Sequence, residues 1–553
     1  ELPSPPPTNL TLQLDEVATN LGVEVVVAFE CEAARPPRKA LLRLTDTGET
    51  RTLGGELQDV EPPAALLAVS RGWAEEVRSL LFPALPPVAE SDLGFPASTA
   101  ASSALAEALG AQQANDFRAA REALTRALNA ETGAGALSGF LALLEERVGD
   151  LASAGEHARR CLELGGFGSR SRKLELQGLV ALSEGKELPA LSLLEERSAI
   201  VGEEIEGGLP RIRLLLQMGR SSAAREVLET LRRTGPTASG DPRLELAAAQ
   251  IAALEEDGTA QLAAARRASE AAESRRAWTF KAAAALEEGE ARFRQRDVAG
   301  SLEGIERAQD FYRRLRDRGG AARAEGAEGI VSAAVGDGPA AAASFDAALR
   351  ILGELGLGGL EGRTLLQQAR FLYTRGEKDR SLEALDRARA RLVELGDRRG
   401  TLEACLVSSA IYHRAGYRQA ADDLLQQAGR LGRELEDPLV AVRVLVRQGE
   451  MDASTGSPAP ARERYEAALE GLEALPGALA SEWTARRIRA SAVLGLTEVL
   501  LAGAQLAEGC SLLAREEPSL RELGSEAISR RASKVRSACP EALNESTWGS
   551  PQP

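Results

Sequence analysis

The side chains that most often carry acid–base or metal chemistry are few and badly spaced in this sequence. Only two histidines occur, His157 and His413, and they lie on distant stretches of the chain. A histidine-centred catalytic or metal site is therefore not expected, and each histidine is assigned to a helix surface.

Adjacent carboxylates form a second group that could perform acid–base chemistry. Neighbouring positions on a helix point in different directions, so such pairs do not converge on one substrate atom. We predict that they occupy solvated helix faces. The pairs are Glu145-Glu146, Glu195-Glu196, Glu203-Glu204 and Glu516-Glu517.

Glycine clusters superficially match nucleotide-binding loops, as in the segment from Gly356 to Gly362. A dinucleotide site needs a strand before the glycines to direct the pyrophosphate at a helix start, whereas a helical pattern precedes this segment. We interpret these glycines as a helix terminator at a repeat junction, and those from Gly165 to Gly168 in the same way. The sequence also lacks the motifs of a protein-kinase core.

Cysteine spacing gives no framework for disulfides or zinc. The cysteines are odd in number and widely separated: Cys31, Cys161, Cys405, Cys510 and Cys539. They are interpreted as small core residues, and the pairing of Cys510 with Cys539 stays open. No cofactor or metal is predicted, and the chain is predicted not to be an enzyme. A hydrolase that uses scattered carboxylates is the residual alternative.

The elements that carry these residues are predicted to be helices arranged in a repeat. A small residue, a large residue four positions later and a small residue three positions further recur with a 40-residue period. The five units are Ser301/Ile305/Ala308, Ala341/Phe345/Ala348, Ser381/Leu385/Ala388, Ala421/Leu425/Ala428 and Ala461/Tyr465/Ala468. Another small residue lies twelve positions before each unit, at Gly289, Gly329, Ala369, Ser409 and Gly449. Small residues on facing helices allow close backbone approach, and the large residue fills the space toward the next unit.

The pattern continues less strictly toward both ends, which gives about eleven units in all. The weaker units are Ala120/Leu124/Ala127, Ala154/Ala158/Cys161, Ala190/Leu194/Arg197, Ala224/Leu228/Leu231, Ala264/Ala268/Ala271 and Ala507/Ser511/Ala514. Of these, Arg197 and Leu231 depart most clearly from the expected residue type.

A mixed region precedes the repeat. Thr11 to Leu14 alternates, Val23 to Phe29 is apolar and largely β-branched, and Asp46 to Glu49 forms a turn between two strand-like runs. Pro62 to Leu81 has a helical pattern. The predicted organisation is a Pro-rich arm (1–8), a small α/β domain (9–82), a linker (83–103), the solenoid (104–524), and a capping helix with a tail (525–553).

Charge excludes some partner classes. Acidic residues outnumber basic ones by 82 to 67, and the net charge of −15 repels nucleic-acid phosphates and anionic lipid head groups. No run approaches the roughly 18 apolar residues needed to cross a bilayer, so membrane insertion by this chain is not expected. The start at Glu1, without Met and rich in proline, is interpreted as processed or truncated. Together with the resemblance given below, it predicts an extracytoplasmic or secreted protein.

The repeat spacing resembles that of the tetratricopeptide repeat family over residues 100–515. Units ending as in Leu395 to Gly400 resemble the forty-residue variants of bacterial signalling proteins. Leu21-Gly22, the turn at Asp46 to Glu49 and Asp116-Phe117-x-x-Ala120 together resemble the extracytoplasmic portions of bacterial eukaryote-like serine/threonine kinases. These resemblances imply a mostly α protein: a tetratricopeptide-like α-solenoid, with helix pairs in a right-handed superhelix, and a small N-terminal α/β domain.

The first helices of such repeats line the concave face, which predicts a binding groove. When the first helices are aligned on their small residues, the outward-facing positions predict the side chains that lie in the groove. These are Arg323, Arg363, Arg370, Tyr373, His413, Arg414, Arg443 and Arg489. Arginines there could bind the carboxylates of a peptide terminus or an acidic segment. The alternative is that they pair with neighbouring glutamates and serve solubility.

Two functions remain open at this point. The first is a scaffold that binds a protein or peptide, as the extracytoplasmic sensor or docking region of a bacterial signalling protein. The second is a secreted subunit that forms homo-oligomers or filaments, through the ends of the solenoid or through addition of the arm and Thr8 to Leu14 to a neighbour's sheet.

Overall fold

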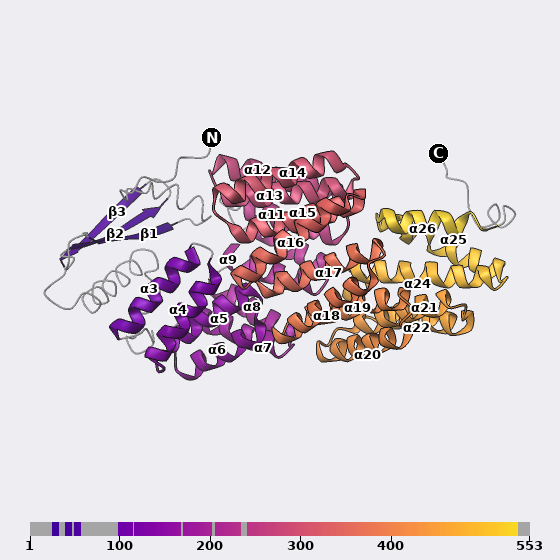
Figure 1. Ribbon diagram of the computed structural model, residues 1–553, viewed down its shortest axis with the longest axis horizontal. Helices are drawn as coiled ribbons and strands as arrows, with labels where there is room; N and C mark the ends of the chain where they lie inside the picture. Colours follow the sequence, from indigo (N-terminus) through magenta and orange to yellow (C-terminus); the bar gives the residue numbers. More distant parts are fainter. Residues whose placement is uncertain are drawn as a thin grey trace.

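The computed structural model shows an elongated stack of helix pairs (Figure 1). It describes residues 98–113, 116–166, 170–201, 205–233 and 240–539, and the backbone of three strands at 25–31, 39–46 and 49–56. Among the described helices, none combines the length and the hydropathy of a bilayer-spanning segment.

The three strands form one antiparallel sheet in the order β1-β2-β3. They are β1 (Val25–Cys31), β2 (Lys39–Asp46) and β3 (Glu49–Glu56). Asp46 pairs with Glu49 across the β2–β3 connection, where the sequence predicts a turn. The arm, the strand at Thr11, the helix from Pro62 to Leu81, most of the linker and the C-terminal tail lie outside the described residues. The α/β domain and the domain boundaries therefore stay predictions.

The first half of the stack consists of consecutive helix pairs whose lengths vary. The pairs are α3 (Thr99–Gln113) with α4 (Phe117–Ala130), α5 (Gly135–Val148) with α6 (Leu151–Glu163), α7 (Arg170–Ser183) with α8 (Glu187–Val201), α9 (Ile205–Gln217) with α10 (Ser221–Arg233) and α11 (Pro242–Leu254) with α12 (Gly258–Ser274).

The second half is more regular, because each helix from α13 to α22 begins 20 residues after the previous one. The pairs are α13 (Trp278–Arg294) with α14 (Val298–Arg314), α15 (Arg318–Val335) with α16 (Gly338–Leu355), α17 (Gly358–Thr374) with α18 (Lys378–Glu394), α19 (Arg398–Arg414) with α20 (Arg418–Glu434) and α21 (Pro438–Ser454) with α22 (Pro458–Glu473). A short α23 (Gly477–Ala480) precedes α24 (Trp483–Ala502), α25 (Leu506–Glu522) and a final α26 (Glu526–Arg536).

Two local structural features, one at the end of each helix and one at the start of the next, explain the regular spacing of the helices. A residue in the left-handed region ends each helix from α11 to α21, as at Arg316 (φ 57°) and Gly336 (φ 88°). An aspartate commonly follows and accepts a hydrogen bond from a backbone N–H of the next helix, as Asp317 does from Gly320 at 2.9 Å. Gly356 ends α16 in the same way, which confirms that the glycine cluster beginning there is a helix terminator.

The five 40-residue units form the contacts between helices that the sequence predicts. Every one of their fifteen small and large residues is at most 1% exposed. The helices come so close that a Cβ atom added at Gly304 would lie 2.8 Å from the Cα atom of Gly289. The Ser381 hydroxyl donates to the Ala369 carbonyl at 2.7 Å, which joins two small positions directly. Paired helices therefore bury their apolar faces against one another and against the next pair.

The register predicted for the last unit, Ala507/Ser511/Ala514, is wrong by two residues. Ala507 and Ser511 are exposed, whereas Gly509 and Leu513 are buried. The short helix α23 is inserted before α24 and ends the 20-residue spacing, so extrapolation of the strict pattern misses the register of α25.

The solenoid also contacts itself across a long sequence separation. The Ala152 N–H donates to the Leu395 carbonyl at 3.1 Å, and a Cβ atom at Gly149 would lie 3.1 Å from the Cα atom of Gly359. Further along, the Glu482 carboxylate accepts from the N–H groups of Ser222 and Ala223 at the start of α10. We call this line of contacts the seam. Its members are Gly149, Ala152, Gly185, Glu187, Gly219, Ser222, Ala223, Glu256 and Arg296 on one side, and Gly359, Leu395, Gly396, Arg398, Arg399, Glu482, Thr484, Arg487, Ser525 and Glu526 on the other.

Candidate functional site

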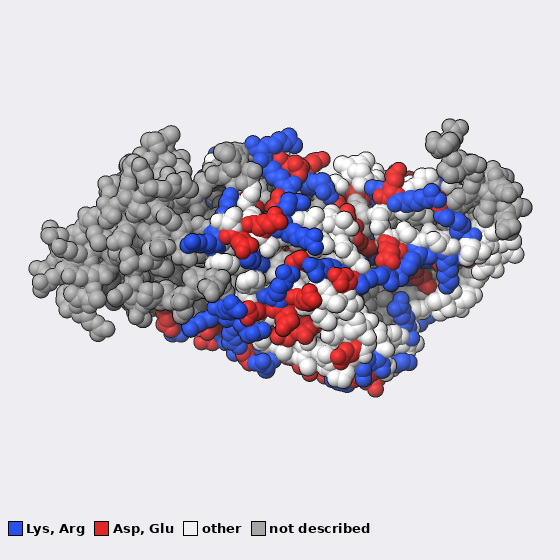
Figure 2. Space-filling model, turned by 90° about the horizontal axis from the view of Figure 1, so that it is seen from above, with Lys and Arg blue, Asp and Glu red and all other residues white. Residues whose placement is uncertain are grey.

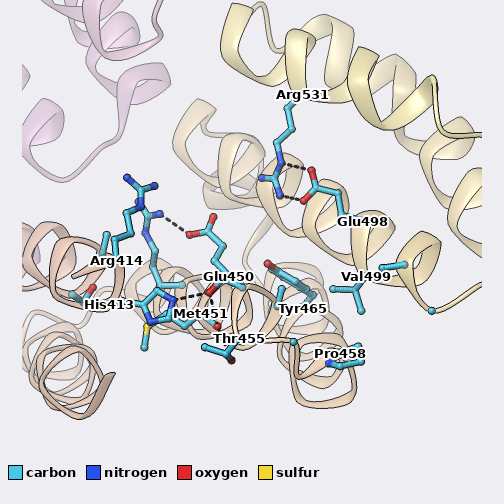
Figure 3. A pocket seen from close by; sticks show the side chains of 18 of the residues that line it. His413, Arg414, Glu450, Met451, Thr455, Pro458, Tyr465, Glu498, Val499 and Arg531 are labelled. Atoms are coloured by element: carbon cyan, nitrogen blue, oxygen red, sulfur yellow. Dashed lines mark hydrogen bonds and ion pairs between the residues drawn. The ribbon is translucent and has the colours of Figure 1, made fainter. Parts of the chain in front are cut away.

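A cavity of about 1200 Å³ opens along the first helices of the C-terminal pairs. Side chains from α17, α19, α21 and α24 line it, the second helix α22 contributes Pro458 and Tyr465, and the final helix α26 contributes Arg531 (Figure 3). We call this cavity the groove. Most of its lining comes from first helices, because the second helices carry the small and large residues that pack between units.

The groove is net basic. It contains three arginines and two glutamates. Arg447 donates to Glu450 at 2.6 Å, and Arg531 donates to both carboxylate oxygens of Glu498 at 2.9 and 2.7 Å (Figure 3). Both glutamates thus already have a guanidinium partner.

Arg414 is the exception among these arginines. It is exposed at the C-terminal end of α19 and has no carboxylate partner among the described residues. Burial and the charge of Arg447 lower the pKa of Arg370, although the charge of Glu403 opposes them. The predicted residues therefore include two guanidinium groups that form no ion pair among the described residues.

Aromatic and apolar side chains complete the surface. Tyr465, Met451 and Val499 line the groove (Figure 3), and Tyr373 lines it as well. Burial raises the pKa of Tyr465, so this phenol stays protonated. A lining of this kind gives an extended ligand both apolar contact and charge pairing.

His413 and Ser454 form the one contact in the groove that is similar to a nucleophile–base pair. The His413 Nε2 atom lies 2.6 Å from the Ser454 hydroxyl oxygen. That hydroxyl donates its hydrogen to the Met451 carbonyl at 2.8 Å, so His413 Nε2 must be the donor in their contact. The His413 Nδ1 atom is buried and has no partner among the described residues. The imidazole thus neither accepts the serine proton nor has an orienting group, and the pair is not arranged for nucleophilic catalysis.

The structure distributes the eight predicted groove residues over several places. Tyr373, His413 and Arg414 line the groove itself. Arg323 and Arg363 line a second cavity of about 1120 Å³, and Arg443 lines a third of about 700 Å³. Arg370 and Arg489 do not appear among the lining residues of these three cavities.

Three of the predicted arginines have carboxylate partners, as the solubility alternative requires, and one of them is Arg363, which lies 3.6 Å from Asp397. Arg443 donates to both oxygens of Glu403 at 2.6 and 2.8 Å, and Arg489 donates to both oxygens of Glu516 at 3.0 Å. Glu403 occupies the position in its repeat that Arg363 and Arg443 occupy in theirs, so it interrupts the expected arginine stripe.

Several lining residues were not predicted. Arg447 lies at a position of the repeat that the register did not select, and Arg531 and Glu498 belong to the less regular C-terminal end. The helical spacing could have predicted that Arg447 lines the groove. It lies one helical turn from Glu450 and two turns from Ser454, on the same face of α21. For Arg531 no signal existed, since only the packing of α26 over α24 brings it to the groove.

Some carboxylates predicted to be solvated are buried, which corrects that interpretation. Glu145 is buried and binds His157 Nδ1 at 2.8 Å, so His157 is not a simple surface residue either. Burial lowers the pKa of His157, but the hydrogen bond and charge of Glu145 raise it more, giving a net increase. Glu516 and Glu517 are also buried at the C-terminal end of the stack, where arginines neutralise them. Glu203 and Glu204 lie outside the described residues.

The cysteines fall into two groups. Cys161 and Cys405 are buried free thiols, as expected, and burial raises the pKa of each to about 11. Cys510 and Cys539 form a disulfide, which settles the pairing that the sequence left open and corrects their interpretation as core thiols. This bond ties α25 to the end of the segment that carries α26.

Stacked helix pairs with small residues at their crossings define a helical-repeat solenoid of the tetratricopeptide type. No protein-family model matches the chain. No curated protein sequence matches it either.

Solved structures with low sequence identity are similar in fold. A Rap protein complexed with competence and sporulation factor is 13% identical, covers 66% of this chain and 100% of its own, and has a TM-score of 0.42. Yeast Tom70 is 15% identical, with 82% and 97% coverage and a TM-score of 0.36. A human IFIT1 dimer with m7Gppp-AAAA is 15% identical, with 72% and 90% coverage and a TM-score of 0.40. All three TM-scores are below 0.5.

Proposed function

We propose that this protein is a non-enzymatic interaction scaffold whose groove binds an acidic, extended segment of a partner protein. The observation that carries the proposal is the sign of the charge inside the solenoid. Arginines outnumber carboxylates in the groove and in both other large cavities, although the whole chain has a net charge of −15. An acidic segment gains favourable charge interactions there and avoids the acidic remainder of the protein.

The described residues on the face shown in Figure 2 give no competing site of this kind. On the face shown in Figure 2, basic and acidic side chains of the described residues are interspersed, without a large area of one sign. Such surfaces contribute solubility more than recognition. Charge recognition is therefore assigned to the groove, where Arg414 offers a guanidinium fork that can bind a carboxylate through two hydrogen bonds.

The finer proposal is that the chain is the extracytoplasmic sensor or docking region of a bacterial signalling protein. The disulfide between Cys510 and Cys539 supports an oxidising compartment, because such bonds persist mainly outside the reducing cytosol. The resemblance of its N-terminal part to extracytoplasmic regions of bacterial kinases is consistent with this location.

A peptide array followed by calorimetry tests the proposal. We expect peptides rich in Asp and Glu to bind the wild-type protein, and Arg414→Gln to weaken binding by roughly tenfold, the usual effect of losing one charge-assisted pair. Arg433→Gln is the matched control, since Arg433 is exposed on α20 and lines none of the three cavities. Equal affinity in wild type and Arg414→Gln would remove the groove from the proposal.

The alternative function is a secreted subunit that assembles through its N-terminal sheet. The order β1-β2-β3 leaves β1 and β3 at the edges of the described sheet, where another strand can add. Light scattering and electron microscopy at high protein concentration decide this alternative. A monodisperse monomer would contradict it, and concentration-dependent filaments would support it.

A further inference from the structure

A second cavity, distinct from the groove, lies between two parts of the chain that are distant in sequence. Its volume is about 1120 Å³, and its walls come from α3 and from α5 to α9 on one side and from α15, α17 and α19 on the other. We call it the inner cavity. Seam residues bound it, including Gly149 and Gly359 and the ion pair of Arg399 with Glu187.

Three arginines of the inner cavity have no carboxylate partner among the described residues. They are Arg147 on α5, Arg213 on α9 and Arg323 on α15, and each side chain is exposed. Arg147 lies over the ring of Phe117, with its Cζ atom 5.0 Å from the ring centre, a contact that brings no carboxylate to it.

The other arginines of this cavity differ, because each has a carboxylate nearby. Arg363 lies 3.6 Å from Asp397, Arg398 lies 3.0 Å from Glu434, and Arg399 binds Glu187. The cavity arginines that form no ion pair among the described residues are therefore Arg147, Arg213 and Arg323, and they come from three helices that only the fold brings together.

Glu146 is the one carboxylate of the inner cavity that forms no ion pair among the described residues. Burial raises its pKa, and the charge of Glu175 raises it further, although Arg213 and Arg147 oppose this. The charges of both Arg213 and Arg147 act on Glu146, so these two guanidinium groups reach the same part of the cavity. An anion placed there would interact favourably with both.

The inner cavity also has a substantial apolar surface. Leu143, Leu182, Leu360 and Leu366 are among its lining residues. A ligand that consisted only of charge would leave these side chains facing water. Its volume is close to the range of roughly 300–1000 Å³ that is typical of sites for small molecules.

We propose that the inner cavity is a binding site for a small organic polyanion, with two or more phosphate or carboxylate groups on an apolar body. Arg147, Arg213 and Arg323 bind the acidic groups, because guanidinium forks match both phosphate and carboxylate geometry. The leucines contact the body of the ligand. The seam contacts beside Gly149 and Gly359 favour a molecule of this size over a folded partner.

Calorimetry at constant ionic strength tests this proposal with three probes. Adenosine triphosphate carries phosphates on an aromatic body, benzene-1,3,5-tricarboxylate carries carboxylates on one, and inorganic pyrophosphate has no body. We expect at least one of the first two to bind the wild-type protein with a Kd below about 100 μM, and Arg213→Gln to weaken that binding by roughly tenfold or more. Arg433→Gln is again the matched control and should bind like the wild type.

The outcomes separate the two ligand chemistries and separate this site from the groove. Binding of the triphosphate alone identifies a phosphate ligand, and binding of the tricarboxylate alone identifies a polycarboxylate, and either result supports the proposal. No binding of either probe, equal binding to Arg213→Gln, or tighter binding of pyrophosphate than of both would overturn it. Arg414→Gln should keep the polyanion affinity, so failure here is distinguishable from failure of the acidic-peptide groove.

A stability measurement provides a second readout that does not depend on ligand affinity. Without an anion, Arg213 adds repulsion to Arg147 and Arg323, so we expect Arg213→Gln to melt at or above the wild-type temperature. The bound probe should then raise the melting temperature of the wild type more than that of the variant. Two results together would contradict the proposed role of Arg213. They are a melting temperature of the variant below that of the wild type, and a rise in melting temperature with the probe that is as large in the variant as in the wild type.

Discussion

Arg399 and Glu187 form a two-pronged ion pair across 212 residues of sequence, with N–O distances of 2.7 and 2.5 Å. The side chains are 14% and 7% exposed, and Arg399 also donates to Asp437 at 3.0 Å. The pair joins α8 to α19 and so holds one part of the solenoid against another. Burial lowers the pKa of Arg399, but hydrogen bonding and charge from Glu187 and Asp437 raise it more, so the guanidinium stays charged.

Removing the carboxylate of this pair should destabilise the protein. Glu187→Gln leaves a largely buried guanidinium with only one carboxylate, so we expect a loss of about 1–3 kcal/mol in the free energy of unfolding. Urea unfolding measures this loss. The matched control is Glu434→Gln, which breaks the neighbouring but exposed pair with Arg398 and should cost less than about 0.5 kcal/mol. Equal losses for the two variants would show that the seam does not contribute to stability as described.

Because of Glu287, the free energy of unfolding of the wild-type protein should fall as the pH rises from about 4.5 to about 7. Burial and the charge of Glu290 raise its pKa to about 7 from an ordinary 4.5, although the hydrogen bond from Gln261 lowers it. The folded state therefore holds a proton that the unfolded state releases, and the contribution is fully present below pH 4.5 and lost as pH rises through 7. Glu287→Gln should be more stable than the wild type at pH 8, by on the order of 2 kcal/mol, and similar to it near pH 5.

Unfolding curves at the two pH values check this expectation. The control is Glu303→Gln on α14, an exposed position where the same change should have little effect at either pH. A Glu287→Gln variant that is less stable than the wild type at pH 8 would mean that the ionised carboxylate is required by the fold.

The disulfide should stabilise the C-terminal end of the solenoid. Cys510 and Cys539 are 29 residues apart, and closing a loop of that length contributes about 3–4 kcal/mol by restricting the unfolded chain. We expect the double variant Cys510→Ser with Cys539→Ser to lose protection in α26 first, as seen by hydrogen exchange. Unchanged exchange in α26 after reduction of the wild type would contradict this role.

The left-handed residues at helix ends predict a stabilising substitution. Arg316 has φ 57°, a conformation that glycine adopts without steric cost. Arg316→Gly should therefore raise the free energy of unfolding by roughly 0.5–1 kcal/mol. Arg314→Gly, two residues earlier inside α14, should instead cost about 1 kcal/mol through helix propensity. A loss of stability in both variants would show that the junction does not depend on backbone conformation.

The repeat could be predicted from the sequence because its information is local. Gly289, Ser301 and Ile305 are close in the chain, and their sizes alone determine how two adjacent helices pack. The pair of Arg443 with Glu403 was also within reach, since the two residues hold the same position in successive repeats. A comparison of the charges at equivalent positions of successive repeats would have predicted this ion pair.

The seam and the inner cavity could not be predicted in this way. Ala152 and Leu395 are ordinary residues whose contact depends on how far each repeat rotates relative to the last, a quantity that accumulates over many helix pairs. Arg147 and Arg213 belong to the less regular units, where the spacing gave no register. The predicted row of arginines along the groove is interrupted for a simpler reason. Glu403 stands at the repeat position where the neighbouring repeats have Arg363 and Arg443.

Photo-crosslinking from the groove tests the central claim most directly. A photoreactive phenylalanine derivative would replace Tyr373 in the groove, or Arg433 on α20 as the control, and each protein would be irradiated with the tightest-binding acidic peptide. The account predicts a crosslink from position 373 that an unlabelled acidic peptide competes away, and none from position 433. Crosslinking that is equal at both positions, or confined to position 433, would contradict recognition of acidic segments by the groove.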